Sequence, residues 1–169
     1  MNLHNKRVLR SVLALSGAAF FATIATPALA ATTTSTMTVT ATVQPSCTIS
    51  AGSSIGLGSV DVLAASAGAS GSVTVKCTNS TAWTATASGS AANGRELTHS
   101  NGTDKLKYQL YTDAGYSTVW SDGASGSTIG DTGSGSDQTK SVYAKVLSGQ
   151  STAKLGSYSD TVTITVTYN

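Results

Sequence analysis

The sequence predicts an all-β fold of the sandwich type. Two segments of the 169-residue chain, residues 36–43 and 161–168, alternate strictly between apolar and hydroxyl side chains. Because the side chains of a strand point alternately to opposite faces, each segment predicts one apolar stripe backed by a stripe of threonines. Between them lie short Val- and Thr-rich runs separated by Gly, Ser and Asn clusters, and no segment after residue 30 shows a 3.6-residue apolar period. Seven or so short strands with turn signals between them predict a sandwich.

The first thirty residues are expected to direct export and then to be removed. A basic start, Lys6–Arg10, precedes an apolar run at residues 12–24 that is short for a membrane span, and a small-x-small site follows at residues 28–30. This order is typical of a secretory signal peptide cleaved between Ala30 and Ala31. An uncleaved membrane anchor is the alternative. No membrane span is expected in the mature chain.

The mature chain is weakly charged. It has 169 − 30 = 139 residues, which suits one domain. Three of the ten Lys and Arg residues leave with the signal peptide, so its net charge is 7 − 8 = −1. The remaining basic residues are scattered, and the sequence therefore offers no electrostatic footprint for nucleic acid.

Further strands are expected between the two alternating segments, each bounded by turn-forming residues. The candidates are residues 47–49, 55–60, 72–78, 82–87, 105–111 and 140–147. The glycine-rich tract Ser121–Gln138 has little to bury and is expected to be a mobile surface loop with a short strand near Ile129. The stretch Thr98–Asn101, which contains His99, is expected to be a solvated turn.

Cys47 and Cys77 are the only cysteines. In an exported chain an even pair predicts one disulfide. A loop of this length predicts that the bond contributes about 3–4 kcal/mol to stability. The spacing excludes a CxxC redox pair, and a metal site would need more ligands.

The mature chain shows no pattern typical of an active site. His99 is its one histidine, no serine is marked as a nucleophile, and the aspartates at positions 104, 113, 122, 131 and 137 lie in turn-like sequence, where Asp commonly bonds its own backbone. Phosphate-loop, calcium-loop and zinc spacings do not occur. The sequence therefore predicts a protein that is not an enzyme, with no catalytic residue, cofactor or metal.

The C-terminal segment carries the most specific motif of the chain. Gly156, Tyr158 and Asp160 lead into an alternating run made of Val162, Ile164, Val166 and Tyr168. With this motif, the run Leu106–Asp113 followed by Trp120, and Val73–Cys77 with Cys47 as partner, the chain resembles the spore coat protein U domain family over essentially its whole mature length. Leu57-Gly58 and Tyr143-Ala144 stand where the family usually has Phe-Gly and Tyr-Gly, and both changes are conservative for packing.

This family includes subunits of archaic chaperone–usher pili. The resemblance implies an incomplete immunoglobulin-like antiparallel β-sandwich that lacks its last strand. It implies a periplasmic pilus chaperone and an outer-membrane usher as partners, together with other copies or related pilus subunits. It also implies assembly in which a neighbour's N-terminal extension replaces the strand that the chaperone lends, a form of strand addition to an open sheet edge. The chain would pass through the periplasm to the cell surface and become part of a fimbrium.

The residue pattern agrees with this scheme. The C-terminal stripe ends one residue before Asn169, which leaves an open edge. The N-terminal stripe consists of Met37, Val39, Ala41 and Val43, and Pro45 separates it from Cys47 because proline disfavours continued ladder pairing. We therefore expect a signal peptide at residues 1–30, a donor-strand extension at residues 31–44 and a sandwich domain at residues 45–169. Pairing of the N-terminal strand within its own domain is the alternative.

The function expected from these observations is that of a structural pilus subunit that supports adhesion and biofilm formation. Two alternatives remain open at this point. One is the tip adhesin of such a pilus, and the other is a monomeric secreted coat or matrix protein.

Overall fold

The computed structural model describes residues 29–52, 54–64, 68–89, 92–124 and 126–169, and it is all-β, with no helix in these ranges. The chain divides into a unit that ends at Thr40 and a unit Ala41–Asn169. Most of the expected signal peptide, residues 1–28, lies outside the described residues. The strands of the described part are β1 (Cys47–Ala51), β2 (Ala69–Cys77), β3 (Ala82–Ala87), β4 (Arg95–His99), β5 (Lys105–Tyr111), β6 (Ile129–Thr132), β7 (Gln138–Val146), β8 (Tyr158–Ser159) and β9 (Ile164–Tyr168).

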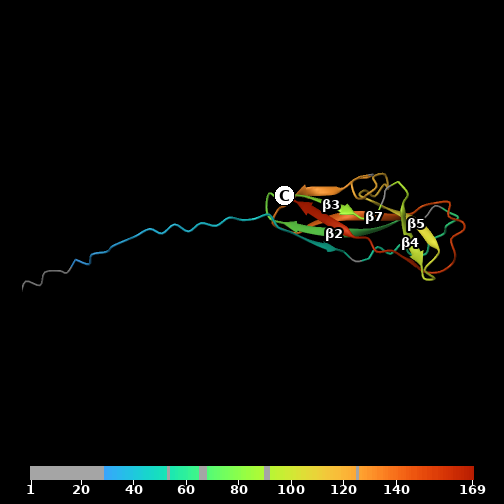
Figure 1. Ribbon diagram of the computed structural model, residues 1–169, viewed down its shortest axis with the longest axis horizontal. Coiled ribbons are helices and arrows are strands. Elements are labelled where there is room, and N and C mark those ends of the chain that lie inside the picture. The colour runs from blue at the N-terminus through green and yellow to red at the C-terminus, as the bar shows by residue number, and fades with distance from the viewer. Residues whose placement is uncertain (1–28, 53, 65–67, 90–91, 125) are drawn as a thin grey trace, which may run out of the picture. The chain divides into compact units, whose positions relative to one another are not determined.

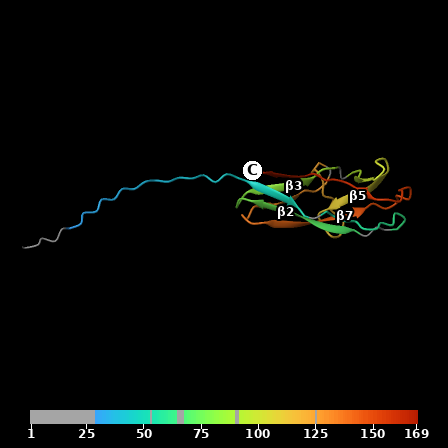
Figure 2. The ribbon, with the colours of Figure 1, turned by 90° about the horizontal axis from the view of Figure 1, so that it is seen from below.

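The strands form two antiparallel sheets that pack into a sandwich-like fold. The larger sheet has the order β1-β2-β7-β5-β4-β8, and the smaller one has the order β6-β3-β9. Figure 1 shows β2 and β7 side by side, and in the turned view β3 lies in a separate layer from them (Figure 2). The last two strands belong to different sheets, because β8 pairs with β4 and β9 pairs with β3. The chain therefore crosses from one sheet to the other between Ser159 and Ile164.

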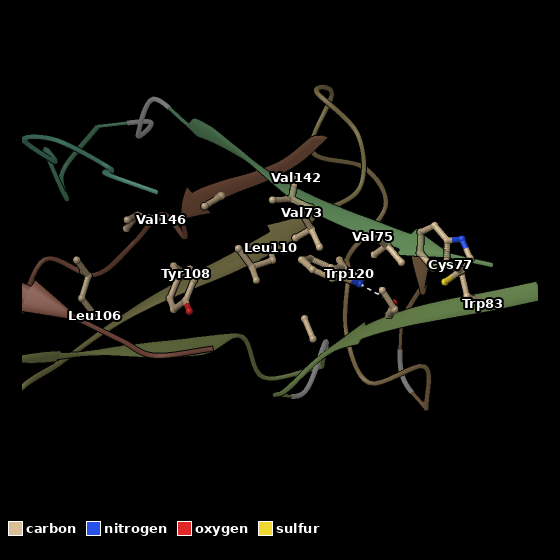
Figure 3. Close-up of a cluster of buried hydrophobic side chains, with 13 residues drawn as sticks. Val73, Val75, Cys77, Trp83, Leu106, Tyr108, Leu110, Trp120, Val142 and Val146 are labelled. Carbon is tan, nitrogen blue, oxygen red and sulfur yellow. Dashed lines mark hydrogen bonds between the residues drawn. The ribbon is translucent and has the colours of Figure 1, made fainter. Parts of the chain in front are cut away.

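The core lies between the two sheets and is built from alternate residues of β2, β3, β5 and β7. Figure 3 shows Trp120 among Val73, Val75 and Leu110. Trp120 is 1% exposed, and its indole Nε1–H donates to the carbonyl oxygen of Ala85 at 3.1 Å. The largest side chain of the core thus connects the segment after β5 to β3 of the other sheet.

The predicted disulfide is present. Cys47 opens β1 and lies directly opposite Cys77 at the end of β2, and the two are bonded. Among the described residues β1 pairs with β2 alone, and after Cys47 its residues are all exposed. The covalent bond therefore fastens an edge strand that buries little surface of its own.

Most predicted strands are confirmed. Residues 72–78, 82–87, 105–111 and 140–147 coincide with β2, β3, β5 and β7 to within three residues at each end, and the short strand near Ile129 is β6. The prediction at residues 161–168 is confirmed from Ile164 onward. The first three residues of that segment lie in the crossing between the sheets.

Three predictions are corrected, and one strand was missed. Residues 36–43 form no strand and are exposed, since a strand needs a partner for its hydrogen bonds. Residues 55–60 form no strand either. The tract 121–138 does not lie entirely on the surface, because Ser121 at its start is fully buried. A strand that was not predicted, β4, lies at residues 95–99.

The prediction for His99 is also wrong, because this residue ends β4 and is half-buried. Its ring packs edge-on against Tyr158 with the centroids 4.8 Å apart. Its Nδ1 accepts the N–H of Asn101, and its Nε2 lies 3.1 Å from the carbonyl oxygen of Leu155. The histidine fixes the end of β4 to the segment that precedes β8.

Candidate functional site: a groove beside the last strand

The last strand, β9, is paired along one edge only. Its five residues face β3 from Trp83↔Tyr168 to Ala87↔Ile164, and no strand of the described residues pairs with its other edge. The apolar stripe of this segment points toward the core, yet Val162, Ile164 and Val166 are only half-buried. An edge strand whose inward face is partly uncovered is the usual mark of a missing neighbour.

A strand-like segment without a ladder lies across the gap from β9. After β1 the chain packs Ile55, Leu57, Val60 and Val62 half-buried against the core. Residues 54–60 nevertheless make no hydrogen bond to any other described residue. Apolar side chains alone hold this wall of the gap in place, and its backbone N–H and C=O groups remain available.

Two adjoining cavities fill the gap, and together we call them the groove. The first has a volume of about 240 Å³. Its floor is made of the core residues Val73, Leu110 and Trp120, and Ile55 and Ile164 belong to its walls. The second, of about 660 Å³, extends along residues 54–62 toward the 153–160 segment. Because protein cores are close-packed, an apolar hollow such as the first cavity, which reaches buried core residues, is a place where a further segment can pack.

One carboxylate lies in the lining of the groove, whose first cavity is mainly apolar. Asp160 borders both cavities and sits at the start of the crossing from β8 to β9. Its Oδ2 accepts the hydroxyl hydrogen of Tyr108 at 2.6 Å, and its Oδ1 accepts the N–H of Thr161 at 2.7 Å. Burial, and then the hydrogen bond to Asp160, raise the pKa of Tyr108 well above its ordinary value, so this hydroxyl stays a donor.

A buried arginine stabilises the same region through hydrogen bonds. Arg95 on β4 is 4% exposed, and its guanidinium donates to the carbonyl oxygens of Ser88, Ala87 and Trp120 and to the side chain of Gln109. Desolvation lowers the pKa of Arg95 from its usual value. Its hydrogen bonds join β4 and β5 of the larger sheet to the end of β3 in the smaller one, so the two sheets stay in register beside the groove.

Sequence reasoning missed Arg95 and the Tyr108–Asp160 pair. A signal for the arginine existed in the alternation of Arg95 and Leu97, which places a cation on the inward face of a strand. Asp160 belonged to the recognised C-terminal motif, but only the fold brings it to Tyr108, which is distant in sequence.

The other predicted site residues fall into two groups. Val162 and Ile164 line the groove, Val166 is half-buried further along β9, and Tyr168 is 42% exposed at the end of that strand. The N-terminal stripe is exposed, with Met37 at 87%, Val39 at 83%, Val43 at 83% and Ala41 likewise exposed. Such a row of apolar side chains in water is a candidate for burial in a partner.

The described residues offer no cluster of three or more His, Cys, Asp or Glu side chains that could hold a metal ion. Within the same ranges, no helix has the length and apolar character needed to cross a membrane.

Comparisons with known proteins place these features in context. Residues 33–165 match the Spore Coat Protein U domain family. No curated protein matches the chain. Among solved structures, the chain is similar to a chain of the CsuC–CsuE chaperone–tip adhesion subunit pre-assembly complex from the archaic chaperone–usher Csu pili of Acinetobacter baumannii. The identity is 19% and the TM-score 0.51, and the match covers 74% of this chain but 40% of that one. At this identity the likeness concerns the fold.

Proposed function

The chain belongs to the Spore Coat Protein U domain family, and from that premise we propose that it is a structural, non-catalytic subunit of a chaperone–usher pilus. Subunits join by donor-strand complementation, in which residues 36–43 of one molecule enter the groove of the next. The single observation that carries this proposal is the groove itself. Its first cavity is an apolar gap that reaches the core beside the unpaired edge of β9, in a chain that also exposes an apolar strand-like segment.

The chemistry of the two partners is complementary. The N-terminal stripe presents Met37, Val39, Ala41 and Val43 at every second position, which is the spacing of side chains on one face of a strand. The groove offers the inward stripe of β9 on one side and Ile55 with Leu57 on the other. An inserted strand would bury its apolar face on the core and turn its threonines outward.

Magnitudes favour insertion between two edges over docking on one. Burying Met37, Val39 and Val43 contributes roughly 1.5–3 kcal/mol each. Ordering about eight residues costs on the order of 1–2 kcal/mol per residue. Side-chain burial alone does not offset that cost, so backbone hydrogen bonds must contribute. The free edge of β9 and the unpaired backbone of residues 54–60 are the two places that can supply them.

The partners follow from the same mechanism. The open groove of a newly exported subunit needs temporary cover, which a periplasmic chaperone gives by lending a strand, and an outer-membrane usher then exchanges it for a neighbour's strand. The similar Csu structure is a chaperone–subunit complex, which supports this assignment. In this proposal residues 1–30 are the signal peptide, cleaved at Ala30–Ala31, residues 31–44 the donor extension and residues 45–169 the acceptor domain. The product is a cell-surface fimbrium that serves adhesion and biofilm formation.

The test separates the two faces of the donor segment. Val39→Asp puts a charge on the apolar face, and the matched control Thr38→Asp puts the same charge on the opposite face. Surface material is extracted without boiling and separated in detergent. We expect a ladder of multimers for the control and monomers for Val39→Asp. Equal ladders for both variants would refute donor-strand assembly through this face.

A second measurement addresses the position of the subunit. Immunogold labelling along the filaments is expected for a shaft subunit, whereas label confined to filament ends would identify a tip adhesin. Native mass measurement of the wild-type extract tests the monomeric coat protein, for which only discrete monomers should be found.

A further inference from the structure

The Tyr108–Asp160 hydrogen bond stands at the point where the last strand changes sheets. β8 is hydrogen-bonded to β4 in the larger sheet, and β9 to β3 in the smaller one. Tyr108 extends from β5 of the larger sheet and donates to the first residue of the crossing at 2.6 Å. The bond therefore fixes the start of the groove wall that continues into Val162 and Ile164.

Tyr108 and Asp160 differ in exposure. Their hydrogen bond therefore contributes more once the groove is filled than while it is open. Tyr108 is 4% exposed, whereas Asp160 is exposed in the structure and borders both cavities. While the groove is open, water can solvate the carboxylate. Once an apolar strand fills the groove, that water is displaced, and a carboxylate without a hydrogen-bond donor becomes costly to bury.

We propose that Tyr108 is a positioning residue for strand capture: its hydroxyl holds Asp160 at the crossing and keeps the carboxylate hydrogen-bonded when an incoming apolar strand covers it. The inference rests on the proposed function and assigns a polar requirement to an otherwise apolar site. It predicts that the hydroxyl contributes more to strand binding than to the stability of the open domain.

The charged and titratable groups around Asp160 define the electrostatic setting. Arg95 on β4 and Tyr108 on β5 lie close enough to interact with it. Tyr158 on β8 and Lys154 line the second cavity with it, and Lys154 is paired with Asp104 at 3.1 Å. The guanidinium of Arg95 donates its hydrogen bonds to carbonyl oxygens and to Gln109. Tyr108 is therefore the side chain that donates a hydrogen bond to Asp160.

The experiment uses the mature chain, residues 31–169, and a fluorescein-labelled synthetic peptide of residues 36–44. Binding is measured by fluorescence anisotropy from pH 7 to pH 4 for the wild type, Tyr108→Phe, Asp160→Asn and the double variant. At pH 7 we expect Tyr108→Phe to bind about ten- to a hundredfold more weakly, because the covered carboxylate loses its side-chain donor and keeps the N–H of Thr161. The unfolding midpoint of Tyr108→Phe without peptide should stay near that of the wild type, since Asp160 is then solvated.

The pH dependence distinguishes this role from a packing role. In Tyr108→Phe the covered carboxylate gains by taking up a proton, so binding consumes a proton and affinity recovers toward the wild type as the pH falls. Asp160→Asn and the double variant carry no carboxylate there. They should show no such recovery. Removing the Tyr108 hydroxyl should also weaken binding less in the Asp160→Asn background than in the wild type, because the amide costs less to cover than a charge.

Each remaining outcome decides the matter. If the wild type neither binds the peptide nor forms multimers through its own residues 36–43, the proposed function fails and this inference with it. If the wild type binds and Tyr108→Phe binds equally well at pH 7, the inference is wrong and the proposed function stands. If Tyr108→Phe is weak at every pH and the double variant is equally weak, the ring acts through packing and the inference is wrong. Should Tyr108→Phe fail to fold, a loss of more than tenfold in Asp160→Asn would overturn it.

Discussion

Removing the disulfide tests how β1 is held at the edge of the larger sheet. The change is Cys47→Ser together with Cys77→Ser. The two cysteines are 30 residues apart in sequence. The chain-entropy relation gives a loss of about 3.7 kcal/mol at 25 °C for a loop of that length. This is a large share of the 5–15 kcal/mol that is usual for a domain.

The assay is urea unfolding of the mature chain, followed by tryptophan fluorescence. With an m-value of about 2 kcal/mol per M, the midpoint should fall by about 1.8 M. The wild type in reductant should show the same midpoint as the variant, and the variant should not respond to reductant. This control separates loss of the cross-link from the effect of two serines.

The structure also predicts which strand opens first when the disulfide is removed. After Cys47 the residues of β1 are exposed, and the strand is held by five pairs with β2 alone. Without the bond, amide hydrogens of residues 48–51 should exchange faster relative to those of the β2–β7 pair, because edge strands open locally. A midpoint shift below about 0.5 M urea, or unchanged protection in β1, would refute the reasoning.

Three further predictions concern the core and one loop. Arg95→Met should lower the free energy of unfolding by about 3 kcal/mol or more, since two buried carbonyl oxygens and one part-buried carbonyl oxygen lose a donor. The exposed control Lys107→Met should change it by less than about 0.5 kcal/mol, and urea unfolding measures both. Trp120→Phe should cost about 2–3 kcal/mol in the same assay, because a bulky group and the bond to Ala85 are lost together. Asp113 accepts hydrogen bonds from the N–H groups of residues 118 and 117, and these bonds lower the pKa of its carboxyl. The stability that the carboxylate contributes to the folded chain is therefore present above about pH 4, and it is lost as the pH falls through the pKa in the folded chain. The midpoints of Asp113→Asn and the wild type should therefore differ at pH 7 and converge near pH 2, and a constant difference would contradict this.

The strands that bury one face were predictable from sequence because their pattern is local. The alternation in Val73–Cys77 and in Val142–Val146 matches the residues that the core buries. The disulfide was predictable for a different reason, since an exported chain with two cysteines has one possible internal pairing.

Elements that depend on distant partners were not predictable in the same way. β4 carries Arg95 and Glu96, which are unusual in a central strand, and only the carbonyl oxygens supplied by other elements make the buried arginine tolerable. Residues 55–60 have a strand pattern but no strand beside them to complete a ladder. Alternation reports the faces of a segment, and it does not report whether a hydrogen-bonding neighbour is present.

The candidate groove was predictable in outline and not in detail. The inward stripe of Val162, Ile164 and Val166 follows from period-two spacing, so one wall could be named from sequence. The floor at Trp120 and the pair between Tyr108 and Asp160 depend on packing across both sheets, which residue order alone does not encode.

The direction of β9 bears on how the proposed fibre would carry mechanical load. Interstrand hydrogen bonds in antiparallel pairs lie perpendicular to the strands. β9 faces β3 through five consecutive register pairs. A neighbour's strand lying alongside β9 and pulled along its own length would load such bonds in shear, so that they must rupture together. A pull across the sheet would unzip them one after another. A filament of these subunits should therefore withstand axial tension far better than transverse tearing, a contrast that single-molecule stretching in the two geometries measures directly.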